Sequence, residues 1–493
     1  MLSPEIFLST LALIGAVIVV SALLSGFVER SGLPQVFVFL ALGAVIGPAG
    51  LRLVDIDVDS PILRVVATLS LVLVLFTDAV SLNIRELGER KLLAALVIGP
   101  GTLFSAVLIA LVGWKLLDLS FPLAAILGAA LASTDPVLLR GFLKRPSLST
   151  GVRQALRLES GMNDAVLLPI VLIAIAATSG QHLNSGDWSG LAIKVLLLSP
   201  AAGALVGLAA VASLEFVRRR FGVRRDYESI YSLGVAFAAY AAAEAVHGSG
   251  FLAVFAAGLT ISALDVELCD CFLEYGETTA EMALLFAFVL FGTSLIWSGL
   301  TIAGPLTLIF TLLVLLLRPV AFIPALIPAR ISWKDRGLIA WFGPRGLSSL
   351  LLVLLAVFAN VPGSRNLFTI CCLVVLCSIV LHGLFPLVFL RGAKPDKGEA
   401  RPAVGGEKTV PSSSASPATD AQLSDAEYLE LSELDEVERA GIPVVIADAR
   451  TERTYNDSEW EIPDAARLHP DRAAADADRL KLPLDAVVGV LCA

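Results

Sequence analysis

Charged residues are scarce in this chain, and their scarcity excludes an ordinary soluble protein. Only 16% of the 493 residues are Asp, Glu, Lys or Arg, whereas 56% are apolar, and the mean hydropathy is +0.82. These values lie outside the range of soluble globular domains and are typical of a polytopic membrane protein. We therefore expect membrane lipids as the surroundings, and neither a nucleic-acid partner nor a cofactor.

Cysteine is also sparse, and its spacing excludes a disulfide framework. Of the six cysteines, Cys371, Cys372 and Cys377 lie in one apolar run, and Cys269 and Cys271 lie in what reads as a short acidic loop. Buried structural thiols are the simplest interpretation.

Basic residues are missing before the first apolar run, which Glu5 precedes. A cleaved signal peptide has a basic start, so we expect a first spanning helix instead.

The charge is concentrated at the C-terminus. From Lys394 onward there are 11 basic and 21 acidic residues, a net charge of −10, whereas the remainder carries about +1. The chain therefore divides into a nearly neutral membrane domain (1–392), a linker rich in Pro, Ser, Gly and Ala (393–422), and an acidic tail domain (423–493).

Thirteen apolar runs approach the ~20 residues that a spanning helix needs. They lie near 5–27, 34–50, 62–81, 92–117, 121–140, 154–179, 190–217, 227–246, 250–264, 279–298, 300–328, 336–359 and 366–390. With the N-terminus outside, the cytoplasmic loops hold 16 basic residues and the outer loops hold five. This bias predicts a multi-pass protein of the inner or plasma membrane with an outside N-terminus and a cytoplasmic tail.

Two of these runs are interrupted in the middle. Thr134-Asp135-Pro136 breaks the fifth run, and Gly343-Pro344-Arg345-Gly346 breaks the twelfth. Proline removes a backbone donor, so each helix should open and leave polar backbone groups free. Because the runs are seven apart, they would have opposite orientations, as in inverted-repeat transporters with a midplane ion site.

The sixth run carries Glu159, Ser160, Asn163 and Asp164 in an otherwise apolar stretch. Their spacing puts all four on one helical face. A carboxylate near the bilayer centre costs roughly 2.5–3.5 kcal/mol, so such a cluster is expected to be functional. Asp164, Ser160 and Asp135 offer oxygen ligands for a small monovalent cation, Na⁺ or K⁺, and the same carboxylates can hold a proton instead.

Glu159 needs a counter-ion of its own, because a second anion beside Asp164 would be costly. We favour Arg345 as its partner, because this residue lies at the break itself. Arg318, in the eleventh run, is the competing candidate.

Three segments, "GAALASTDPVLL", "LESGMNDAVLLP" and "FGPRGLSSLLL", in this order, resemble the monovalent cation:proton antiporter superfamily in its sodium/proton exchanger branch. The resemblance covers roughly residues 5–390. It implies an all-α membrane protein of thirteen helices in two inverted repeats, with crossing broken helices, a core domain that moves against a dimerisation domain, and a homodimer.

The resemblance also implies roles for individual residues. Asp164 would be the shared proton and cation carrier, aided by Asp135, Ser160 and the backbone of Thr134. Glu159 would pair with Arg345, with Asn163 alongside. An Asn-Asp pair at this motif, as at Asn163 and Asp164, implies electroneutral exchange of one cation for one proton.

Asp78 stands where many relatives have a glutamate, but the sequence around it departs from their pattern. It is either an outer ligand or entrance carboxylate, or a plain helix-end residue.

The tail resembles an incomplete rhodanese-like domain. "LSDAEYLELSELDEVERA" predicts an amphipathic helix, and "IPVVIADAR" and "DAVVGVLCA" predict short strands of the parallel α/β kind. Cys492 falls at the position of that family's nucleophile, but the loop that should follow it is absent from this sequence. The missing loop argues against sulfurtransferase activity in this polypeptide, and we expect the tail to have a cytoplasmic regulatory or interaction role.

These observations favour a secondary antiporter that exchanges Na⁺ or K⁺ for protons in pH and salt homeostasis, not an enzyme. Two alternatives stay open, an ion channel or proton-conducting subunit of a larger complex and a membrane-tethered sulfurtransferase. No local motif separates Na⁺ from K⁺ or Li⁺, because selectivity depends on cavity dimensions.

Overall fold

The computed structural model describes most of the helical region and short pieces of the tail. The described residues are 15, 19, 23, 35–82, 91–143, 148–178, 185–221, 225–264, 266–389, 444–448, 465–468, 476, 479, 480 and 487–491. The chain divides into two compact units, Met1–Ala400 and Arg401–Ala493.

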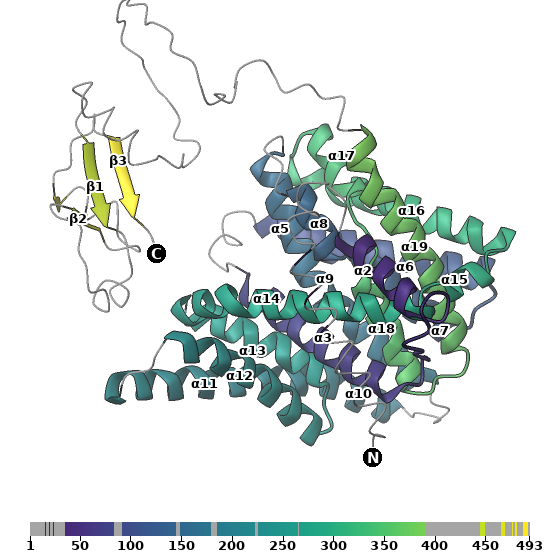
Figure 1. Ribbon diagram of the computed structural model, residues 1–493, viewed down its shortest axis with the longest axis horizontal. Helices are drawn as coiled ribbons and strands as arrows, with labels where there is room; N and C mark the ends of the chain where they lie inside the picture. The colour runs from purple at the N-terminus through teal and green to yellow at the C-terminus, as the bar shows by residue number, and fades with distance from the viewer. Residues whose placement is uncertain are drawn as a thin grey trace, which may run out of the picture. The chain divides into compact units, whose positions relative to one another are not determined.

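The first unit is built from α-helices (Figure 1). In chain order they are α2 (Gln35–Ile46), α3 (Pro61–Val80), α5 (Lys91–Leu96), α6 (Thr102–Leu116), α7 (Phe121–Ala132), α8 (Pro136–Leu143), α9 (Thr150–Thr178), α10 (Ser185–Ile193), α11 (Ser199–Phe221), α12 (Arg225–Ala245), α13 (Gly250–Leu264), α14 (Val266–Leu290), α15 (Ser298–Thr301), α16 (Pro305–Ala325), α17 (Trp333–Trp341), α18 (Leu347–Phe358) and α19 (Ser364–Phe389). Short π-helical segments continue α5 into α6, α10 into α11 and α14 toward α15, namely η1 (Val97–Gly101), η2 (Lys194–Leu198) and η3 (Phe291–Leu295). A 3₁₀ turn, η4 (Ile327–Ala329), follows α16.

Eight helices among the described residues are long and apolar enough to cross a membrane, and four shorter apolar helices accompany them. Together they overlap every predicted run from 34–50 to 366–390. Nearly all of the first predicted run, 5–27, lies outside the described residues. A mostly helical polytopic membrane protein is thus confirmed, and the total of thirteen spans stays a prediction.

The acidic segment after α13 is helical, so the predicted loop there was wrong. α13 ends at Leu264, and α14 begins at Val266 and continues to Leu290. The segment contains no proline, and acidic side chains do not interrupt a helix that extends beyond the apolar layer. Cys269 and Cys271 therefore lie on α14.

The helices form two packed groups. One contains α6, α7, α9 and α16–α19, and the other contains α2, α3 and α11–α14; α3 touches α9 and α18 where the groups meet (Figure 1). Buried aromatic side chains, among them Phe76, Phe288 and Phe310, belong to one core shared by both groups. A second cluster, including Phe142, Phe322 and Phe342, lies beside the broken helices.

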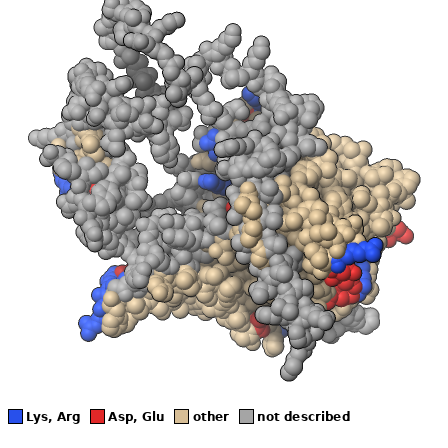
Figure 2. All heavy atoms as spheres, in the orientation of Figure 1, with Lys and Arg blue, Asp and Glu red and all other residues tan. Residues whose placement is uncertain are grey.

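The outer surface of the helices is largely apolar. Figure 2 shows uncharged side chains over most of the described surface in view, with charged residues gathered in small clusters. At the end of α11, for example, Arg218, Arg219 and Arg220 form the last turn. This distribution suits a helical body in contact with lipid.

Both predicted helix breaks are confirmed. α7 ends at Ala132, the chain is extended at Ser133, and α8 begins at Pro136, where proline needs no backbone donor. α17 ends at Trp341 and α18 begins at Leu347, with Pro344 inside the gap.

The second unit contains a small parallel sheet. Its strands β1 (Val444–Asp448), β2 (Ala466–Arg467) and β3 (Val487–Leu491) are arranged in the order β2-β1-β3. The two predicted strands and their parallel pairing are confirmed. The predicted helix after Leu423, the linker 393–422 and Cys492 lie outside the described residues.

Candidate functional site

The two broken helices cross at Asp135. The backbone N–H of Asp135 donates to the carbonyl of Pro344 at 2.9 Å. Its carboxylate accepts two further backbone hydrogen bonds, from Val137 to Oδ1 at 2.8 Å and from Leu347 to Oδ2 at 2.7 Å. Asp135 therefore caps α8 and α18 together, and one anion stabilises the positive ends of two half-helices.

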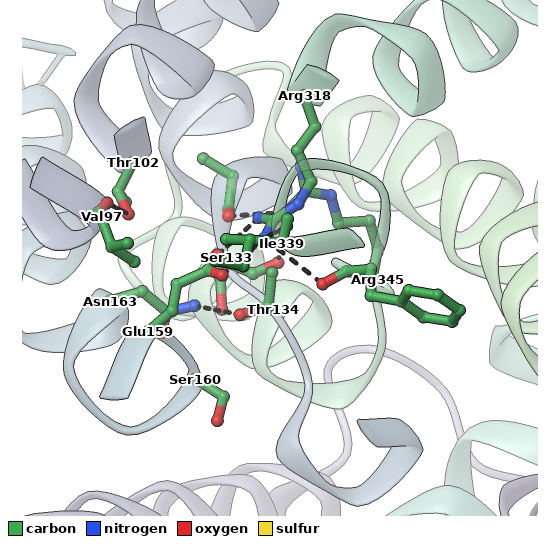
Figure 3. A network of polar contacts seen from close by, with 12 residues as sticks. Val97, Thr102, Ser133, Thr134, Glu159, Ser160, Asn163, Arg318, Ile339 and Arg345 are labelled. Carbon is green, nitrogen blue, oxygen red and sulfur yellow. Dashed lines mark hydrogen bonds and ion pairs between the residues drawn. The ribbon is translucent and has the colours of Figure 1, made fainter. Parts of the chain in front are cut away.

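At the two breaks, an arginine side chain binds the C-terminal end of α7 and another binds the C-terminal end of α17. Arg345 Nη1 donates to the carbonyls of Ala132 and Ser133, at 2.6 and 3.1 Å, where α7 ends. Arg318 Nη2 donates to the carbonyls of Ile339 and Phe342, at 3.1 and 3.3 Å, where α17 ends (Figure 3). Positive charge at a helix C-terminus is stabilising, so the four half-helix ends at this crossing all have charged partners.

Glu159 pairs with Arg318, and the predicted pair with Arg345 was wrong. The two side chains form a bidentate ion pair with both N–O distances at 2.5 Å, and both are almost completely buried. Arg318 also lies over the Phe322 ring, 4.1 Å from the ring centroid. Arg345 is unsuited to this role because its guanidinium is held by the carbonyls at the end of α7.

Two glycines make the crossing possible. A Cβ added at Gly346 would lie 2.0 Å from Oδ2 of Asp135, and one added at Gly343 would lie 2.2 Å from Nε of Arg318. Both positions therefore require the smallest residue, because a charged group occupies the space of a side chain.

Asp164 differs from the other charged groups at the crossing. It lies on α9 with 2% of its surface exposed. Ser133 Oγ donates to its Oδ1 at 2.5 Å, and Ser348 on α18 interacts with the same carboxylate. Within the described part of the chain it has neither an ion-pair partner nor a helix terminus to cap. Asp164 is thus a buried carboxylate held only by hydroxyl groups.

Asn163 and Ser160, the other predicted residues on α9, have hydrogen-bond partners of their own. Asn163 Nδ2 donates to Thr134 Oγ1 at 2.7 Å and so joins α9 to the first break. Ser160 Oγ donates to the carbonyl of Arg157 at 3.2 Å, which leaves its oxygen lone pairs available as a ligand. Figure 3 shows the Ser160 side chain pointing away from the contacts of Glu159 and Asn163.

Asp78 lies on the last turn of α3, against α9. A Cβ added at Gly161 would meet the Cβ of Asp78 at 3.8 Å and its backbone oxygen at 3.9 Å. The neighbouring Ser81 hydroxyl donates to that same backbone oxygen at 2.9 Å. Asp78 therefore lies next to Gly161 of α9, and its role as an outer ligand or entrance carboxylate stays a prediction.

Sequence reasoning missed the hydroxyl groups beside the breaks. Ser133 immediately precedes Thr134-Asp135-Pro136, and Ser348 and Ser349 directly follow the second break. Their signal was the clustering of hydroxyls at an interrupted apolar run. Ser378 and His382 on α19 were also missed, although they repeat the four-residue polar spacing that marked α9.

Comparisons with known proteins agree with this architecture. The model of the family described as sodium/hydrogen exchanger, transmembrane, matches residues 16–390. The chain belongs to this family. It is 27% identical over 380 residues to the K(+)/H(+) antiporter NhaP of Alkalimonas amylolytica, covering 76% of this chain and 65% of that relative. It is 28% identical over 376 residues to the K(+)/H(+) antiporter NhaP2 of Shewanella baltica (strain OS223), covering 75% and 64%. The chain thus spans just under two thirds of the length of these relatives.

The fold of this exchanger-family chain resembles a solved structure. The sodium proton antiporter MjNhaP1 from Methanocaldococcus jannaschii at pH 8 aligns with a TM-score of 0.64 at 22% identity, over 77% of this chain and 99% of that one. At this identity the comparison establishes a shared fold.

Proposed function

We propose that this protein exchanges a monovalent cation for protons across a membrane, with Asp164 as the carrier of both. The observation that carries the proposal is the isolation of the Asp164 carboxylate. It is buried at the crossing of two broken helices and held by hydroxyl groups alone. Such a group can release a proton only when a cation replaces it, because a bare carboxylate is costly there. Competition for one carboxylate then couples the two fluxes.

The other charges at the crossing support a stoichiometry of one cation for one proton. Glu159 is neutralised by Arg318, and Asp135 and Arg345 are opposite charges fixed on helix ends. The charges of these four groups cancel, so the net charge of the site depends on what is bound to Asp164. One proton or one monovalent cation leaves the same net charge, and exchange is therefore electroneutral.

Oxygen ligands for the cation come from the same crossing. We assign Asp164 and Ser160 to the ligand set, with the backbone at Thr134 as a further donor of oxygen. Asp135 was predicted as a ligand, but both its oxygens already accept backbone N–H groups. We propose that Asp135 acts chiefly by holding the two half-helices together and that Na⁺ or K⁺ binds beside it.

Transport in proteoliposomes tests this function. Purified protein with an internal pH dye should show cation-driven proton flux with Na⁺ or K⁺, and Li⁺ should be tested in parallel. Asp164→Asn should abolish the flux, and retained exchange would remove Asp164 as the carrier. Asn163→Ala, next to it, should keep measurable exchange. Transient currents on solid-supported membranes should be absent if exchange is electroneutral, and steady current would favour a channel.

We propose further that the chain has thirteen spans in two inverted repeats, an outside N-terminus, a cytoplasmic tail, and a homodimeric assembly. The two broken helices and the biased distribution of basic residues support the topology. Cysteine accessibility from each side of the membrane would test it, and the mass of the detergent-solubilised protein would test the dimer.

For the tail, we propose a rhodanese-like domain with a regulatory or interaction role. Its parallel strand order β2-β1-β3 supports an α/β domain. A thiosulfate:cyanide sulfurtransferase assay on the full chain should give no activity above that of a Cys492→Ser variant.

A further inference from the structure

A series of polar contacts that begins at Arg345 holds the break between α17 and α18. The backbone N–H of Arg345 donates to Ser378 Oγ on α19 at 2.7 Å. Ser378 Oγ in turn lies 3.2 Å from Nδ1 of His382, one helical turn further along. All three residues are buried.

His382 also reaches the other side of the same break. Its ring lies 6.2 Å from the Trp341 ring, centroid to centroid, and it hydrogen-bonds to the backbone of Trp341, the last residue of α17. His382 is therefore connected to the end of α17 directly and to Arg345 through Ser378. The pair on α19 spans the whole gap in the broken helix.

Ser378 offers two oxygens to Nδ1 of His382. Its Oγ lies 3.2 Å from Nδ1, and its backbone carbonyl oxygen lies 3.1 Å from the same nitrogen. Because a carbonyl oxygen only accepts, Nδ1 donates to it, while Ser378 Oγ accepts the backbone N–H of Arg345. The charged groups near the ring are Arg345, from the break, and Arg318, from α16.

We propose that Ser378 and His382 are positioning residues for the ion site. They fix the backbone of the break so that the Arg345 guanidinium stays on the carbonyls of Ala132 and Ser133. The Ser133 hydroxyl, on the same residue, is the donor to Asp164. The pair on α19 thereby acts on Asp164 through two intermediate residues without touching it. This inference rests on the proposed exchange function.

The expected signature is a change in affinity. Loosening the break lowers the fraction of molecules in which the Asp164 surroundings are assembled, and apparent affinity falls by that fraction. Ser378→Ala and His382→Ala should each raise the apparent KM for the cation by about 5–10-fold, while the maximal rate changes less than about twofold. The double variant should be no worse than either single variant, because both residues belong to one chain of contacts.

Conservative substitutions separate positioning from packing. His382→Asn keeps an amide near the place of Nδ1 that can donate to the Ser378 carbonyl, so KM should stay within about twofold of the wild type. Cys377→Ala, on the same turn of α19, is the matched control and should leave KM unchanged. Thermal unfolding of each variant in detergent shows whether it is folded. If His382→Ala does not fold, Ser378→Ala and His382→Asn decide the question.

Several results would overturn this inference. One is an unchanged KM in Ser378→Ala and His382→Ala. Another is additive losses in the double variant, or a fall in maximal rate alone, because either would indicate ordinary packing. Wild-type protein measured alongside separates this failure from failure of the proposed function, in which no cation-driven flux occurs at all.

Discussion

Leu347 donates its backbone N–H to the Asp135 carboxylate at 2.7 Å, although 212 residues separate the two along the chain. Leu347 begins α18, and Asp135 precedes α8. This hydrogen bond links the N-terminal end of α18 to the N-terminal end of α8. It also explains why an aspartate is placed beside proline in the middle of an apolar run.

Asp135→Asn should destabilise the protein more than it alters ion chemistry. The amide replaces one acceptor oxygen with an NH₂ group that faces a backbone N–H, and an unsatisfied buried donor costs about 1–3 kcal/mol. We expect a lower thermal unfolding temperature in detergent. Asp164→Asn is the matched control, since its carboxylate accepts from hydroxyls that can rotate. Equal unfolding temperatures for the two variants would contradict the capping role of Asp135.

Removing one partner of the Glu159–Arg318 pair should be strongly destabilising. Glu159→Gln or Arg318→Met leaves a buried charge without its counter-ion, a cost of roughly 3–5 kcal/mol. The double variant should recover part of that loss, because no lone charge remains.

The exposed pair of Arg365 and Asp59 provides the control for that experiment. Arg365→Gln should cost no more than about 1 kcal/mol, because solvent screens the interaction. Chemical or thermal unfolding of the folded protein measures both pairs. Similar losses of unfolding free energy at the two sites would mean that burial does not increase the cost of breaking the Glu159–Arg318 pair.

Gly346→Ala and Gly343→Ala should prevent assembly of the crossing. The added methyl group would lie 2.0 Å from Oδ2 of Asp135 or 2.2 Å from Nε of Arg318, so a charged partner must be displaced. We expect loss of exchange together with reduced thermal stability. Gly337→Ala is the control, since this exposed position inside α17 has no atom within 4 Å of the new Cβ, and a gain of about 1 kcal/mol is expected there. Wild-type activity in Gly346→Ala would show that the close approach is unnecessary.

Cation affinity should fall as the pH falls. In the proposed mechanism Asp164 holds either a proton or a cation, so acid depletes the form that binds the cation. Where Asp164 is mostly protonated, the apparent KM should rise about tenfold for each unit of decreasing pH, with an unchanged maximal rate. Initial rates over a matrix of cation concentrations and pH values measure this. A KM that is independent of pH would contradict competition at a single carboxylate.

Much of the local structure could be predicted from the sequence alone. Proline and glycine located both helix breaks, and the four-residue spacing of Glu159, Asn163, Ser160 and Asp164 placed them on one face. These features follow from backbone sterics and helical periodicity, which act over a few residues. The acidic start of α14 was the local failure, because charge was taken as a sign of a loop where the backbone continues as a helix.

The pairing of charged and polar side chains from different helices could not be predicted without the tertiary structure. Proximity to the break favoured Arg345 for Glu159, but the rotation and crossing of α16 bring Arg318 to that carboxylate and leave Arg345 on the end of α7. The same packing turns the oxygens of Asp135 to two backbone amides and brings Ser133 to Asp164. The sequence by itself determined the membrane class, the broken helices and Asp164 as the expected carrier. Only the tertiary structure decided which charges neutralise one another, because that depends on distances between helices that no local pattern encodes.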